Sequence, residues 1–289
     1  MSALARLRQH PLLRVGLALV GLGLCAWGTA TFALTQRTSD RCPAGMQTQG
    51  ERCCGAGQTL ENGACSGRAS SCSTAQELDE VGQCVARFGV VSFEGGELYI
   101  GATDWDGVSG GERFARTRIA AFRLDVAEVT RQRFRDVTGA ASVQGEPGLP
   151  VSNVTAAEAD EFCRTQRGRL PTAAEWVWAA AGQGARRYAW GNSGLVCRRA
   201  AFGLLGGPCA RQGAGAQGEL VGSRPDGASP EGVLDLAGNV AEWTRELGGG
   251  FAARGGSFRS TSAAELKSWA ALAETNKALH IGFRCAYPP

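Results

Sequence analysis

The sequence predicts a loop-rich α+β domain that follows a single membrane-spanning helix and a small disulfide-rich segment. The chain of 289 residues is 44% hydrophobic, which is enough for a core, and its 42 glycines indicate long connections. An uncharged stretch near the start has the length of a bilayer span. Beyond residue 88, short helices and short strands follow one another without the regular strand–helix alternation of a parallel sheet.

The composition narrows the class of protein. A net charge of +3 is too small to indicate nucleic acid or an acidic substrate, so we expect no nucleic-acid partner. The 11 cysteines favour an oxidising compartment. Zinc is disfavoured because the only histidines are His10 and His280 and no paired C-x-x-C motifs occur.

Residues 1–40 are expected to hold a cytoplasmic tip, a membrane anchor and a stalk. The span covers residues 15–34, which carry no charge, and arginines at 6, 8 and 14 precede it. A cleaved signal peptide is the alternative, with Gly28 and Ala30 at its cleavage site. The length of the apolar run favours an uncleaved anchor. The C-terminal domain would then lie in the periplasm or the extracellular space.

Residues 41–87 form the predicted cysteine-rich segment. Few large apolar side chains separate its cysteines, so disulfides must replace a core. We expect three disulfides, and the sequence does not choose among the possible pairings. The segment is either a small recognition module or a stiff spacer. Its six cysteines are Cys42, Cys53, Cys54, Cys65, Cys72 and Cys84.

Residues 88–289 form the predicted α+β domain. Two short strands flank the Glu-Gly-Gly turn at 94–96, and a helix begins after Thr130 as its N-cap. Apolar residues at helical spacing predict a second helix that ends at Gly168. Thr172, followed three residues later by a glutamate, predicts a capping box and a third helix that Gly182 closes.

Five motifs in this domain occur in an ordered series. They are RLPTAAEWVWAAAG (169–182), YAWGN (188–192), DLAGNVAEWT (235–244), RGGSF (254–258) and GFRC (282–285). In this series the chain resembles the formylglycine-generating enzyme family, also called sulfatase-modifying factor domains. The resemblance implies a compact α+β fold of the C-type-lectin kind, poor in regular secondary structure.

Structural roles follow from residue type and, for one disulfide, from the resemblance. The resemblance implies a disulfide between Cys163 and Cys285, which leaves Cys197 and Cys209 as the remaining pair. Large aromatic side chains in a glycine-rich chain are expected in the core. The arginines of the motifs are expected to clamp loop carbonyls. The tryptophans and arginines concerned are Trp176, Trp178, Trp190, Trp243, Arg169, Arg254 and Arg284.

The same resemblance locates a catalytic site that lacks its ligands. Enzymes of the family use two cysteine thiolates to hold copper(I), activate oxygen and oxidise a substrate cysteine to formylglycine. In the family, these two cysteines are the third and eighth residues after the serine of the GGS turn. The serine is Ser257 in this chain, so Ser260 and Glu265 occupy the two cysteine positions. We therefore predict a vestigial site without catalytic residues or copper. With two histidines, the three-histidine iron site of a related branch is not expected either.

One metal site of the family could remain. Carried over from the resemblance, its calcium ligands are Asp235, the carbonyls of Gly238 and Val240, and the Glu242 carboxylate. Oxygen ligands of this mixture suit calcium. The alternative is that the two carboxylates only accept hydrogen bonds from backbone N–H groups. A second calcium site of the family, at RAAFG (199–203), is expected to be lost.

These observations predict a membrane-anchored, exported and catalytically inactive domain that binds a protein, peptide or polysaccharide, or packs within an envelope complex. The alternative is a copper- and oxygen-dependent formylglycine-generating oxidase with unrecognised ligands.

Overall fold

The computed structural model describes residues 42–289 apart from 51, 63, 74–75, 87–88, 100–115, 195, 211–216 and 273–275. The expected membrane span at 15–34 lies outside this part of the chain. Residues 42–289 form one compact unit. Within the described ranges, no helix has the length and apolar character needed to cross a membrane.

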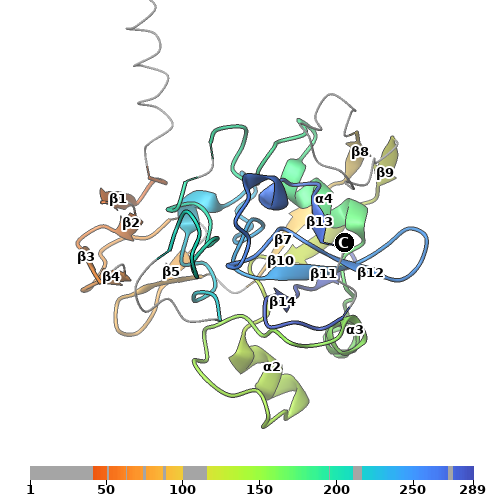
Figure 1. The fold of residues 1–289 in the computed structure, drawn as a ribbon, viewed down its shortest axis with the longest axis horizontal. Coiled ribbons are helices and arrows are strands. Elements are labelled where there is room, and N and C mark those ends of the chain that lie inside the picture. Colours follow the sequence, from red (N-terminus) through yellow and green to blue (C-terminus); the bar gives the residue numbers. More distant parts are fainter. Residues whose placement is uncertain are drawn as a thin grey trace, which may run out of the picture. The chain divides into compact units, whose positions relative to one another are not determined.

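The cysteine-rich segment folds into three small antiparallel hairpins (Figure 1). One of its three disulfides, Cys54–Cys65, joins the first hairpin to the second. The bonds join consecutive cysteines, Cys42–Cys53, Cys54–Cys65 and Cys72–Cys84, and each closes a loop of 11 or 12 residues. The disulfides therefore act locally. The strands are β1 (Met46–Gln49), β2 (Arg52–Gly55), β3 (Thr59–Glu61), β4 (Ala64–Ser66), β5 (Gln76–Leu78) and β6 (Cys84–Ala86).

The following domain contains two small sheets and a further hairpin. A three-stranded sheet has the order β15-β10-β7, a four-stranded sheet has the order β13-β12-β11-β14, and β8 pairs with β9. Both strands around the Glu-Gly-Gly turn form, but they pair with different partners, β10 and β9, and not with each other. The bounds are β7 (Val90–Phe93), β8 (Gly96–Leu98), β9 (Thr117–Ile119), β10 (Phe122–Asp125), β11 (Ala241–Arg245), β12 (Phe251–Arg254), β13 (Ala271–Leu272), β14 (Ile281–Gly282) and β15 (Ala286–Tyr287).

Three α-helices form in the predicted segments, although the second ends at Thr165 and not at Gly168. They are α2 (Arg131–Thr138), α3 (Ala156–Thr165) and α4 (Ala173–Ala181). The Thr172 hydroxyl accepts a hydrogen bond from the Glu175 N–H, and the Glu175 carboxylate accepts one from the Thr172 N–H, which completes the capping box. All nine residues of α4 are buried, so this helix lies at the centre of the core.

Aromatic side chains fill the core, as expected for a chain rich in loops. Trp176 and Trp243 are almost fully buried, and Trp190 is half-buried. A disulfide between Cys163 on α3 and Cys285 beside β15 joins elements 122 residues apart. A second disulfide, Cys197–Cys209, closes a loop of 12 residues.

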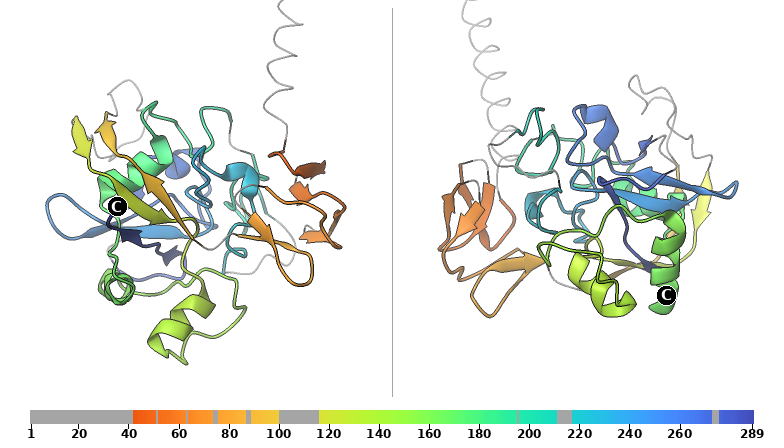
Figure 2. Two further views of the ribbon diagram at one scale, coloured as in Figure 1. Left: turned by 180° about the vertical axis from the view of Figure 1, so that it is seen from behind. Right: turned by 60° about the horizontal axis from the view of Figure 1, so that its bottom comes forward.

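The cysteine-rich segment contacts the α+β domain directly. The Arg52 guanidinium on β2 lies 3.3 Å from the Glu219 carboxylate, and the Gln76 amide on β5 donates to the Gly222 carbonyl at 3.1 Å. In the two views of Figure 2, the hairpins gather beside one side of the domain. The segment is therefore packed against the domain, and its role as a recognition module or as a spacer stays a prediction.

Candidate functional site

The candidate site begins at the turn after β12. Gly255 and Gly256 have φ values of 91° and 66°, which L side chains rarely adopt. A Cβ on Gly255 would lie 3.0 Å from the Trp176 ring, and a Cβ on Gly256 would lie 2.9 Å from the Glu265 carbonyl oxygen. The turn is therefore held by close backbone approach, and the local geometry needs both glycines.

The two serines after this turn bind the backbone. The Ser260 hydroxyl is buried and accepts a hydrogen bond from the Ser257 N–H at 3.0 Å. The Ser257 hydroxyl accepts one from the Arg259 N–H at 3.2 Å. Ser260, at the first expected thiolate position, thus stabilises the turn that carries it.

Glu265, at the second expected thiolate position, caps a short 3₁₀ helix, η5 (Ala263–Leu266). Its carboxylate accepts hydrogen bonds from the Thr261 N–H at 3.2 Å and from the Ser262 N–H at 3.0 Å. The side chain at this expected ligand position therefore has a local structural function.

The donor atoms in the described part of the chain do not fit a copper(I) site. All ten cysteines there are in disulfides, so none can supply a thiolate in this state. The eleventh, Cys25, lies outside the described residues. Within those residues, no group of three or more His, Cys, Asp or Glu side chains is arranged to hold a metal ion. Copper(I) requires soft ligands, and the side chains of Ser260 and Glu265 offer only oxygen.

A buried ion pair lies beside this turn. The Arg284 guanidinium donates to both oxygens of Glu242 at 2.6 Å, and the Trp176 indole N–H donates to Glu242 Oε2 at 2.8 Å. Arg284 also donates to the carbonyls of Asp125, Val126 and Leu234. It is 0% exposed, so the expectation of a clamp on loop carbonyls is met. Arg169 and Arg254 also donate to carbonyls, those of Leu170 and Trp269, and each is paired with a glutamate.

Two further buried carboxylates surround Arg284. Asp235 accepts a hydrogen bond from the Gly222 N–H at 2.5 Å, and burial raises the pKa of Asp235 to about 6. Glu128 accepts hydrogen bonds from the Asn239 amide at 2.7 Å and from the Val240 N–H at 3.1 Å. Burial, followed by the nearby charge of Asp235, raises the pKa of Glu128 well above its usual value.

Glu128 was not identified by sequence reasoning. The only signal was its position two residues before the predicted N-cap Thr130. Its side chain reaches across 112 residues of sequence to the turn before β11, and a local pattern does not reveal such a contact.

Asp235 and Glu242, two of the residues expected to bind calcium, lie close enough to interact electrostatically, but both oxygens of Glu242 already accept hydrogen bonds from a guanidinium. A calcium ion bound to Glu242 would have to share that carboxylate with Arg284. The Ala201 carbonyl, in the block of the second calcium site, accepts a hydrogen bond from the Asn239 N–H at 2.8 Å. Calcium binding stays a prediction.

Comparison with known proteins identifies the protein family. The model of the sulfatase-modifying factor enzyme 1-like domain, the formylglycine-generating enzyme family, matches residues 81–288. The chain therefore belongs to this family. No curated protein sequence matches it.

Solved structures support the same fold. Treponema denticola variable protein 1 is 19% identical with a TM-score of 0.57, over 70% of this chain and 95% of that one. PvdO from Pseudomonas aeruginosa is 17% identical with a TM-score of 0.55, and the match covers 71% of this chain and 95% of PvdO. CarF is 22% identical with a TM-score of 0.51, and the match covers 70% of this chain and 99% of CarF. At these identities the likeness concerns the fold alone.

Proposed function

We propose that this chain is a catalytically inactive member of its family, anchored to a membrane and exported, that acts as a binding or envelope-complex module. The observation that carries the proposal is the replacement of both copper thiolates by Ser260 and Glu265. Each of these side chains accepts backbone hydrogen bonds that stabilise the turn or the helix that follows it. Loss of both soft ligands removes the copper site rather than weakening it.

The proposed location rests on two features. The uncharged residues 15–34, preceded by arginines, have the length and flanking charge of a single span. Five disulfides suit an oxidising compartment such as the periplasm or the extracellular space.

An oxidation assay tests the inactivity. The full chain is incubated in air with copper(I) and a peptide that carries a sulfatase-type cysteine, and the peptide mass is followed. We expect no formylglycine product. A matched double variant, Ser260→Cys with Glu265→Cys, restores the two thiol positions and tests whether the remaining scaffold can bind copper(I). Product formed by the unmodified chain would contradict the proposal and favour an oxidase with unrecognised ligands.

A further inference from the structure

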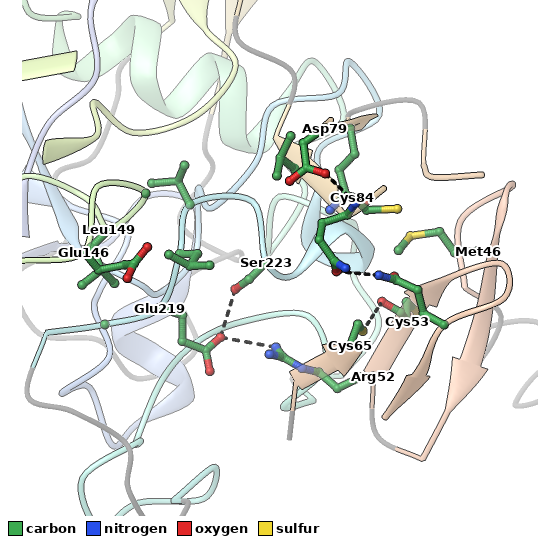
Figure 3. Close-up of a pocket in the computed structure, with 18 of the residues that line it drawn as sticks. Met46, Arg52, Cys53, Cys65, Asp79, Cys84, Glu146, Leu149, Glu219 and Ser223 are labelled. Carbon is green, nitrogen blue, oxygen red and sulfur yellow. Dashed lines mark hydrogen bonds and ion pairs between the residues drawn. The ribbon is translucent and has the colours of Figure 1, made fainter. Parts of the chain in front are cut away.

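A cleft of about 860 Å³ lies between the cysteine-rich hairpins and the α+β domain, and Ser257 and Ser260 do not line it (Figure 3). Its volume is within the range of about 300–1,000 Å³ that is typical of ligand sites. The hairpins form one wall of the cleft, and the loops at 146–149 and 218–223 form the other. The cleft therefore exists only because the cysteine-rich segment packs against the domain.

The hairpin wall is rich in sulfur. Each of the three local disulfides contributes one cysteine to the lining, Cys53, Cys65 and Cys84, and the Met46 thioether adds a fourth sulfur. These polarisable, apolar groups favour aliphatic and aromatic side chains.

The wall formed by the loops of the α+β domain is also apolar. Leu149 and Leu220 line it, and Leu220 is 48% exposed although it is a large hydrophobic residue. Such exposure in a cleft, beside further apolar groups, is typical of a binding surface.

One carboxylate of the cleft lining, that of Glu219, is paired with arginines. The Glu219 carboxylate accepts hydrogen bonds from Arg52 and from Arg224 and is thereby compensated. Arg224 is buried outside the lining, and its charge also acts on Asp235. Among the charged side chains that line the cleft, Arg52 therefore offsets one carboxylate, that of Glu219.

Two other carboxylates remain, one on each wall. Asp79, in the turn between β5 and β6, accepts hydrogen bonds at Oδ1 from the N–H groups of Val81 and Gln83. Its Oδ2 and the exposed Glu146 carboxylate accept none from any residue in the described ranges. Figure 3 shows Glu146 beside Leu149 and Asp79 above Cys84, so the two acidic groups belong to different walls.

We propose that this cleft binds a peptide segment of a partner protein in which basic side chains alternate with apolar ones. The basic side chains pair with Asp79 and Glu146, and the apolar side chains pack on Met46, Leu149 and Leu220. The proposal rests on the binding role proposed above and gives that role a location and a ligand chemistry.

The test uses the full chain in nanodiscs of zwitterionic phosphatidylcholine, with empty nanodiscs as the lipid control. The probe is a fluorescein-labelled, acetylated and amidated octapeptide of alternating lysine and leucine, and binding is followed by fluorescence anisotropy. One control peptide replaces lysine by glutamate, and another replaces leucine by serine. We expect the lysine–leucine peptide to bind at least about tenfold more tightly than either control, and binding to weaken with added salt.

Variants assign the binding to the cleft. We expect Glu146→Gln and Leu220→Ser each to raise the Kd by about fivefold or more. Matched controls are Glu97→Gln, at an exposed carboxylate on β8, and Leu247→Ser, at a leucine that is 75% exposed in the β11–β12 hairpin. These controls should leave the Kd unchanged.

Equal binding of the three peptides, or an unchanged Kd in both cleft variants, would overturn the inference. Neither result would bear on catalytic inactivity, which the oxidation assay tests separately.

Discussion

At the scale of single residues, the candidate site is dominated by buried charge. Glu128, Asp235 and Glu242 surround one guanidinium, that of Arg284, and hydrogen bonds from backbone and side chains stabilise each carboxylate. Removing one partner from such a pair leaves a buried charge without compensation and destabilises a fold by roughly 3–5 kcal/mol. A Glu242→Ala variant therefore cannot report on calcium, because it would damage the fold by breaking the contact with Arg284.

Asp235→Asn is a better probe of this cluster. Asparagine tolerates the positive φ of 57° at this position and can still accept the hydrogen bond from the Gly222 N–H. Because the pKa of Asp235 is raised from 3.8 to about 6 in the folded protein, its contribution to stability is fully present below about pH 4 and is lost as the pH rises through 6. In a chelating buffer, we expect the variant to be more stable than the wild type at pH 7 by up to roughly 3 kcal/mol.

Urea unfolding at pH 4 and pH 7 measures this difference, which should nearly vanish at pH 4. Calcium can then be added at pH 7. If Asp235 is a ligand, calcium raises the unfolding midpoint of the wild type and has little effect on the variant. An equal response of the two proteins would contradict a calcium site at Asp235.

At the scale of elements, local signals agree with the observed helices because caps and periodicity act over a few residues. Thr130, Thr155 and Thr172 each cap a helix through the side-chain hydroxyl. Local signals do not determine which strands pair with each other. β7 and β8 are separated by a two-residue turn but belong to different sheets, because Gly95 and Gly96 redirect the chain with φ values of 81° and 151°.

The cap of α4 gives a prediction at this scale. Thr172→Ala removes the hydroxyl that accepts from the Glu175 N–H, and we expect a loss of about 1 kcal/mol in the free energy of unfolding. Thr172→Ser keeps the hydroxyl and should cost much less. Urea denaturation of both variants measures the effect, and equal losses would show that the methyl group, rather than the cap, stabilises the helix.

At the scale of the whole molecule, disulfides of two kinds hold a loop-rich chain together. Cys163–Cys285 closes 122 residues, whereas Cys197–Cys209 closes 12. In the chain-entropy model the long loop stabilises by roughly 5 kcal/mol and the short one by roughly 3 kcal/mol. The long bond also joins α3 to the segment that leads into β15.

Replacing each pair of cysteines by alanines tests this ordering. We expect the Cys163/Cys285 variant to lose more stability than the Cys197/Cys209 variant, by about 2 kcal/mol. Thermal and urea unfolding of the full chain in the same buffer provide the comparison. Equal losses would indicate that strain or structure in the unfolded state outweighs the loop length.

The sequence by itself determined the family, the three helices, the caps at Thr130 and Thr172, and the absence of thiolates at positions 260 and 265, because each depends on residue identity or short spacing. Only the tertiary structure decided the pairing of the six cysteines, the place of Glu128 beside Asp235 and Arg284, and the cleft between the hairpins and the domain. These features join residues far apart in the chain. Burial and close approach, which no local pattern encodes, govern such contacts.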